Sequence, residues 1–353
     1  MVSYFDSQYP QADDKFISRN DAAHLLATQI KEKKFSTVYA APGYGKRTLV
    51  GKALGMLKSA SYQYTLITLD LFNVTTEKEF CAMYAGAFKK HIEDYNSDAL
   101  FPITLDLGNL SLRNAINLPS TVASFTGINF VVYFKEFQNI MCMDKGEQLL
   151  KLMEKELPGH PIAYIVTGEH ANAMKDIFEN RKFFYRANCN VPLAPLEKKA
   201  SMSYLHNGFL RSGKDLEEET GAAIYQTSKG YPMVMNRLAA MCDNMAVGYI
   251  NRRVLSAAVN AWLEENEPRY RFTMSNLTAN QVNFMRAVCD GVQRFSSSEV
   301  LKNYNLNSSA NVFRLKEALQ KKEIVTFDAE DKATVIDPMF ENWLKERYFV
   351  NRI

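Results

Sequence analysis

The segment that most constrains the fold of this chain is a short apolar run that leads through a glycine-rich turn into an amphipathic stretch. The run at 35–41 predicts a strand, and the stretch that starts near Lys46 and reaches Leu57 predicts a helix. Between them, Ala40-Ala-Pro-Gly-Tyr-Gly-Lys-Arg47 is close to G-x-x-x-x-G-K-[ST], the pattern of a loop that wraps phosphate groups between a strand and a helix. The sequence therefore predicts a phosphate-binding loop at the end of a strand.

Most of the parts that such a loop needs are present. Gly43 and Gly45 permit the backbone conformations of the cradle, the following helix presents its amino terminus, and Lys46 can reach the terminal phosphates. We expect the cofactor-binding residues to be Pro42, Gly43, Tyr44, Gly45, Lys46, Arg47 and Thr48.

Two positions of the loop depart from the pattern. Ala40 replaces the first glycine, and Arg47 replaces the hydroxyl residue that would bind Mg²⁺. Arginine cannot be a metal ligand. Thr48 is a poor substitute, because one residue displaces a side chain by about 100° around a helix.

A second departure follows the predicted strand at 128–134. Lys135 occupies the position of a metal-binding Asp, whereas Glu136, which would polarise an attacking water, is retained. Both positions that would organise a metal are therefore basic, and we expect no metal ligands. Either Arg47 and Lys135 replace Mg²⁺ beside a bound phosphate, or Lys135 pairs with Glu136 or Glu169 and the site is structural.

Strands and helices alternate over the first half of the chain, which predicts a parallel sheet flanked by helices. No element can be assigned with certainty over 95–124. Strands are predicted at 35–41, 65–70, 128–134, 162–167 and 190–193, and helices at 19–34, 46–57 and 80–91.

The second half of the chain is mostly helical. Three helices followed by a β-hairpin at its end predict a winged helix. We expect three domains: a P-loop core at 1–195, a helical lid at 196–270 and a winged-helix domain at 271–353. The helices are predicted at 197–212, 216–228, 232–246, 251–265, 281–289, 297–304 and 308–321, and the hairpin strands at 323–327 and 333–336.

Together these residues resemble the archaeal-type P-loop ATPases of the AAA+/STAND group. Beside the loop, the family's "F-x-x-R", "hhhhDEhQ", "FTGS" and "GHPYY" are similar to segments 16–19, 131–138, 166–169 and 230–233, and "DPhF..WL" to 337–344. The resemblance implies an α/β P-loop NTPase core, ATP or ADP as ligand, and catalytic roles for Glu136 and Arg186. Arg186 falls where the family places an arginine that faces a phosphate, often that of a neighbouring nucleotide; pairing with a surface carboxylate is the alternative.

Composition excludes several classes. The net charge is only +3, from 42 basic and 39 acidic residues, which does not indicate a dedicated nucleic-acid protein. The polar start lacks the features of a signal peptide, and no apolar run approaches the roughly 20 residues of a membrane span. Five scattered cysteines without a CxxC pair indicate a cytoplasmic protein with reduced thiols.

Three functions remain open. The first is a nucleotide-dependent switch or scaffold that works with a protein partner or by self-association. The second is a weak Mg²⁺-dependent ATPase that uses Lys46, Glu136 and Arg186, with the metal held through Thr48 and water. The third is a DNA-binding regulator, with Arg314, Lys316, Lys321 and Lys322 as phosphate contacts; the acidic turn at 328–332 disfavours it.

Overall fold

The computed structural model describes residues 3–6, 16–96, 108 and 110–350. The chain divides into two compact units. One is Arg19–Leu193, and the other joins Met1–Ser18 to Ala194–Ile353. The predicted three-domain division stays a prediction.

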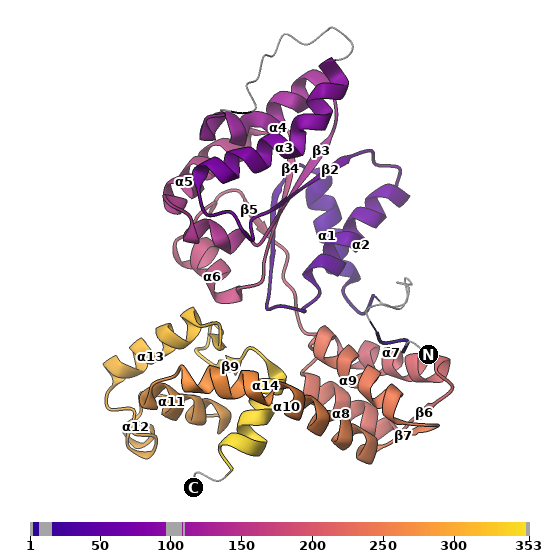
Figure 1. Ribbon diagram of the computed structural model, residues 1–353, viewed down its shortest axis with the longest axis vertical. Helices are drawn as coiled ribbons and strands as arrows, with labels where there is room; N and C mark the ends of the chain where they lie inside the picture. The colour runs from indigo at the N-terminus through magenta and orange to yellow at the C-terminus, as the bar shows by residue number, and fades with distance from the viewer. Residues whose placement is uncertain (1–2, 7–15, 97–107, 109, 351–353) are drawn as a thin grey trace. The chain divides into compact units, whose positions relative to one another are not determined.

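The first unit is built on a five-stranded parallel sheet with the order β2-β3-β4-β1-β5 (Figure 1). The predicted α/β fold with a parallel sheet is thereby confirmed. The strands are β1 (Phe35–Tyr39), β2 (Thr65–Asp70), β3 (Phe130–Lys135), β4 (Ala163–Gly168) and β5 (Asn188–Asn190).

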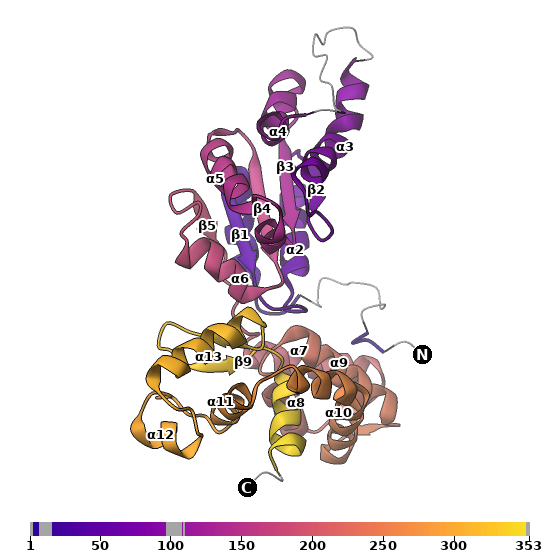
Figure 2. The ribbon, with the colours of Figure 1, turned by 60° about the vertical axis from the view of Figure 1, so that its left-hand side comes forward.

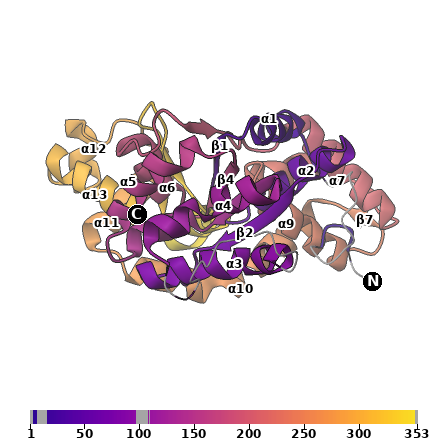
Figure 3. The same cartoon turned by 90° about the horizontal axis from the view of Figure 1, so that it is seen from above.

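Helices cover both faces of this sheet (Figures 1 and 3). On β3, Phe130, Val132 and Phe134 point into a core that also holds side chains of α3, α4 and α5, whereas Tyr133 and Lys135 alternate onto the other face. The helices are α1 (Asn20–Lys31), α2 (Lys46–Ser59), α3 (Glu77–Asn96), α4 (Leu112–Thr126), α5 (Gly146–Glu156) and α6 (Ala171–Lys175), with a π-helical turn η4 (Asp176–Asn180) and 3₁₀ turns η2 (Phe137–Cys142) and η3 (Leu157–Gly159).

Part of the unassigned stretch at 95–124 forms α4. The Ser111 side chain caps this helix by accepting a hydrogen bond from the backbone N–H of Asn114, and Pro119 lies inside the helix. Proline and several Ser and Thr residues weaken the helical signal of this segment, which explains why the sequence pattern did not reveal it. The part at 97–107 lies outside the described residues.

The second unit is mainly helical and ends in a three-helix and hairpin arrangement (Figure 2). Helix α10 runs through the predicted lid boundary at residue 270. No described helix has the length and apolar character to cross a membrane. The elements are α7 (Lys198–Arg211), β6 (Asp215–Leu216), α8 (Glu218–Ser228), α9 (Pro232–Met245), β7 (Tyr249–Ile250), α10 (Arg252–Ser275), α11 (Ala279–Cys289), α12 (Ser298–Asn303), α13 (Ser309–Lys321), β8 (Val325–Phe327), β9 (Ala333–Val335), α14 (Pro338–Trp343) and the π-helical turn η5 (Leu344–Tyr348).

Helix α14 ties the two halves of this unit together. Its buried Glu341 accepts hydrogen bonds from Lys229, which follows α8, and from Lys345 (Nζ–Oε1 2.7 Å). The rings of Phe340 and Trp343 pack against Tyr270 of α10. The winged-helix part is therefore fixed to the preceding helices by an apolar contact and a buried carboxylate.

The N-terminal segment packs on α7 of the same unit. Tyr4 and Phe5 are buried, and the Phe5 ring contacts Tyr204 and Phe209. A Cβ atom on Gly208 would lie 2.3 Å from Phe5 Cζ, so only glycine leaves room for this ring. Residues far apart in sequence therefore share one small core.

Candidate phosphate site

The glycine loop after β1 has the backbone of a phosphate cradle. Gly43 and Gly45 have φ angles of 73° and 91°, which favour glycine, and α2 begins directly at Lys46. The helix amino terminus and successive N–H groups suit an anion. Ala40 is not among the positive-φ residues, so alanine is tolerated in place of the first glycine.

The Lys46 side chain folds back onto its own loop. Its ammonium donates to the carbonyl oxygens of Ala40 and Ala41 over 2.7 and 2.8 Å. The side chain is buried, and this burial lowers the pKa of Lys46 to about 8, although Glu169 and Glu136 oppose the shift. Lys46 is thus held at the loop as a cation that titrates close to neutral pH.

Arg19 supports the loop from the start of α1. Its Nη1 donates to the Tyr44 carbonyl over 2.5 Å, and its guanidinium lies 5.0 Å from the centre of the Tyr44 ring. Burial lowers the pKa of Arg19. The sequence pattern placed Arg19 in a motif but gave it no role; its place beside the loop became visible only in the fold.

Lys135 forms neither of the ion pairs that the sequence suggested. Within the described part of the chain it has no ion pair with Glu136 or Glu169, and its ammonium lies 5.8 Å from the centre of the Tyr133 ring. The parallel register of β2 and β3 sets Lys135 beside Asp70. The lysine therefore stays at the carboxyl edge of the sheet.

Glu136 directly follows β3 in a left-handed conformation, with φ 52°. Its Oε2 accepts a hydrogen bond from Gln138 Nε2 over 2.8 Å, and Gln138 is buried. A non-glycine residue in this region carries strain, which is common at functional positions. The carboxylate is thus held in one orientation at the same edge as Lys135.

Tyr133 is close to several of these charged groups. Its hydroxyl accepts a hydrogen bond from Thr167 Oγ1 over 3.2 Å, and burial raises its pKa, which Arg47 partly opposes and Glu136 and Asp70 reinforce. The positive charge of Arg47 therefore acts on the Tyr133 hydroxyl of β3. Arg47 and Thr48 are both exposed on the first turn of α2.

Arg186 is not brought to this loop. It lies two residues before β5, whose first residue, Asn188, pairs with Phe35 at the start of β1. Since the loop follows the other end of β1, the length of that strand, roughly 15 Å, separates the two positions. Arg186 is exposed and lies away from the loop.

The cationic side chains at this end of the sheet suit a phosphate. No group of three or more His, Cys, Asp or Glu side chains that could hold a metal exists among the described residues. Lys46 and Arg47 begin α2 directly after the loop, and Lys135 ends β3, which β4 separates from β1.

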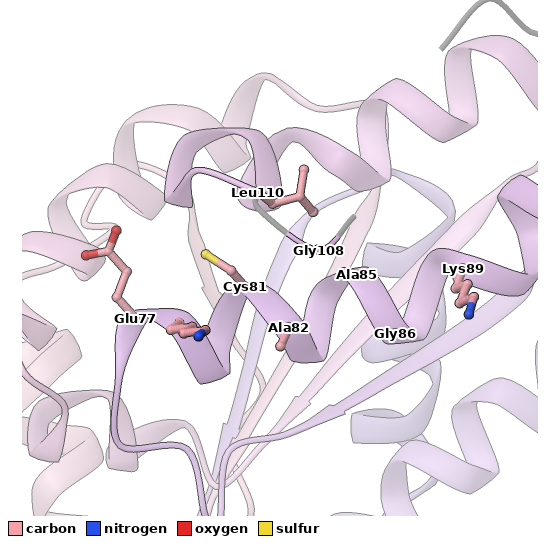
Figure 4. Close-up of a pocket in the computed structure, with 9 residues that line it drawn as sticks. Glu77, Cys81, Ala82, Ala85, Gly86, Lys89, Gly108 and Leu110 are labelled. Carbon is pink, nitrogen blue, oxygen red and sulfur yellow. The ribbon is translucent and has the colours of Figure 1, made fainter. Parts of the chain in front are cut away.

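A second concave region is separate from this site. A hollow of about 740 Å³ runs along α3 and is lined by Glu77, Cys81, Ala85, Lys89 and Leu110 among others (Figure 4). None of the predicted site residues lines it.

In the winged-helix part, the Lys316 side chain contacts other residues of the same domain. Its ammonium pairs with Asp331 of the hairpin turn and lies 5.0 and 5.4 Å from the rings of Phe327 and Phe295. Arg314 and Lys321 are exposed on α13. Lys316, one of the predicted phosphate contacts, is thus already paired with a carboxylate of the protein.

Comparisons with known proteins agree with this architecture. Residues 268–346 match a family model described as a probable winged helix domain. No curated protein matches the chain in sequence.

Three solved structures are similar over nearly their whole lengths. The Walker-type ATPase PABY2304 of Pyrococcus abyssi has 18% identity and a TM-score of 0.68, covering 97% of this chain and 99% of that one. The Aeropyrum pernix ORC2 protein, in ADPNP–ADP complexes, has 12% identity and a TM-score of 0.60, covering 97% and 95%. The Aeropyrum pernix ORC1 protein in complex with DNA has 14% identity and a TM-score of 0.51, covering 99% and 97%.

The chain therefore has the fold of a P-loop ATPase of the AAA+ type. A winged-helix domain completes it at the C-terminal end, as the sequence predicted.

Proposed function

We propose that this protein is a nucleotide-binding switch or scaffold of the AAA+/STAND kind that holds ATP or ADP without a metal ion. The observation that carries the proposal is the placement of Arg47 and Lys135 beside an otherwise well-formed P-loop. Both are cationic, and neither forms an ion pair within the described residues. Their charge is available to a ligand.

The binding follows from the parts of the loop. Backbone N–H groups at the amino terminus of α2 donate hydrogen bonds to the phosphate oxygens. Protonated Lys46 releases the carbonyls of Ala40 and Ala41 and pairs with the same oxygens. Arg47 and Lys135 supply the positive charge that Mg²⁺ provides in related folds. The ORC2 structure with ADPNP and ADP supports an adenine nucleotide as the ligand.

Hydrolysis is slow or absent in this proposal. Glu136 is oriented by Gln138, but phosphoryl transfer depends heavily on a metal that bridges the phosphates. Arg186 lies just before β5, at the end of β1 opposite to the loop, so it contributes only if a second copy presents it. Its exposure and that of neighbouring Tyr185 support self-association as one mode of partnership.

We further propose a core at 1–195, a lid at 196–270 and a winged helix at 271–353 as the working parts, and a cytoplasmic location, which the five free cysteines support. The winged helix contacts protein rather than DNA in this proposal, because Asp328, Glu330 and Asp331 make its hairpin turn acidic.

Calorimetric titration of ADP and ATP, in EDTA and again in Mg²⁺, tests the proposal. We expect the natural protein to bind equally well in both buffers. The variant Arg47→Thr/Lys135→Asp, which restores a hydroxyl and a carboxylate for the metal, should bind about tenfold more tightly in Mg²⁺ than in EDTA. The matched control Arg47→Lys/Lys135→Arg keeps both charges and should remain indifferent to Mg²⁺. No binding of either nucleotide in either buffer would refute the proposal.

A further inference from the structure

The order of strands fixes what lies between the P-loop and the end of β3. Strand β4 is hydrogen-bonded to β1 on one side and to β3 on the other. Tyr39 at the end of β1 pairs with Gly168 at the end of β4, so the next residue, Glu169, is level with Ala40. Glu169 is thus the first side chain beyond the strand that separates the loop from Lys135.

The negative charge of the Glu169 carboxylate acts on the lysine of the loop. It is half-buried, and among the charged groups it acts most strongly on Lys46, ahead of Glu136. The Lys46 ammonium binds the carbonyl of Ala40, the residue level with Glu169. Register and charge therefore place the carboxylate at the same end of the sheet as the ammonium.

This placement has a consequence for the length of a bound phosphate chain. The P-loop holds the phosphates above the end of β1, and a chain that continues toward Lys135 and Glu136 must pass over the end of β4. The last phosphate of the longer chain then meets Glu169. Two anions at short range repel strongly in a partly desolvated site.

We propose that Glu169 makes this site select a nucleoside diphosphate over the corresponding triphosphate. The inference rests on the proposed nucleotide-binding function and adds the residue that sets the preference. Arg47, on α2, serves both ligands in this arrangement, so the discrimination arises from repulsion of the third phosphate.

The experiment compares ADP and ATP by calorimetry in EDTA with four full-length proteins: the natural chain, Glu169→Gln, Glu169→Ser and the control Glu32→Gln. Glu32 is exposed at the opposite end of the sheet, just after α1, so its substitution makes the same charge change away from the loop. We expect the natural chain to bind ADP about tenfold more tightly than ATP. Both Glu169 variants should bring the two affinities together, mainly by strengthening ATP binding, and Glu32→Gln should keep the natural ratio.

The outcomes separate the two proposals. If ADP and ATP bind equally to the natural chain, or if the ratio survives both Glu169 variants, the inference is overturned while nucleotide binding stands. If neither nucleotide binds to any of the four proteins, the proposed function fails and the inference fails with it. Circular dichroism and a thermal melt check that each variant is folded. If Glu169→Gln is not folded, Glu169→Ser provides the test of the inference.

Discussion

Cations at the P-loop edge of one unit differ in their partners from two lysines of the other unit. At the P-loop edge, Lys46 binds only backbone carbonyls, and Arg47 and Lys135 form no ion pair within the described residues. In the other unit, Lys229 pairs with Glu341 and Lys316 with Asp331. An ion pair between two elements contributes to the fold, whereas unpaired cations leave charge that a ligand can use. This contrast is the reason for placing the proposed ligand at the P-loop edge.

The largest test of this contrast removes the buried cation of the loop. Lys46→Ala should weaken ADP binding about 100-fold, because the loop loses its charged donor to the phosphates. The matched substitution Lys52→Ala, later on α2, should leave the affinity unchanged. Calorimetry measures both, and an unaffected Lys46→Ala protein would place the ligand elsewhere.

The second test breaks a paired charge in the other unit. Glu341→Gln keeps the shape of the side chain but leaves Lys229 and Lys345 without their shared carboxylate. Both lysines are nearly half exposed, with 44% and 46% of the side-chain surface accessible, so water offsets part of the loss. We expect a decrease of about 1–2 kcal/mol in the free energy of unfolding by urea, with nucleotide affinity unchanged. A loss of nucleotide binding without a loss of stability would contradict the division of roles.

The third test uses pH. Since burial lowers the pKa of Lys46 to about 8, the ammonium needed by a phosphate is lost as pH rises through that value. Affinity for ADP should fall roughly tenfold from about pH 7 to pH 9. Stability should respond with the opposite sign: between pH 8 and 10.5 the unfolded chain binds the extra proton, so this group makes folding more favourable as pH rises. An affinity that stays flat to pH 10 would show that Lys46 does not contact the ligand.

The smallest effect is expected on the winged helix. Arg314→Ala should weaken any salt-sensitive binding of duplex DNA only about threefold, measured by fluorescence anisotropy. Lys316→Ala should leave DNA binding unchanged and lower stability by roughly 0.5–1 kcal/mol, since Lys316 is paired with Asp331. A large loss of DNA affinity in both variants would instead favour a DNA-binding regulator.

Much of the fold was predictable because its signals are local. The strand at 65–70 and the helix at 232–246 follow from apolar periodicity and lie within one residue of β2 and α9. The strand predicted at 190–193 lies instead at Asn188–Asn190. The backbone N–H of Val191 still donates to the Thr37 carbonyl, but it does so beyond the end of β5. Periodicity also could not show that α10 continues through Pro268 to Ser275.

The site was predictable in composition but not in arrangement. The loop motif identified Lys46 and Arg47, and the apolar strand before Lys135 identified the second half of the site. The position of Glu169 between them depends on the strand order, which no local pattern encodes. The same holds for Arg19, whose contact with Tyr44 joins residues that only the fold brings together.

The packing of Phe5 against Gly208 has a consequence for how this chain can change over time. Any side chain at position 208 collides with the Phe5 ring, so the two positions should not vary independently. Gly208→Ala should be damaging in the natural chain and less damaging in a chain that already carries Phe5→Ala, where only the Tyr4 ring, 2.9 Å from the new Cβ, remains too close. Substitutions in the first residues and in a helix two hundred positions away should therefore be coupled, and the order in which they occur decides which ones are tolerated.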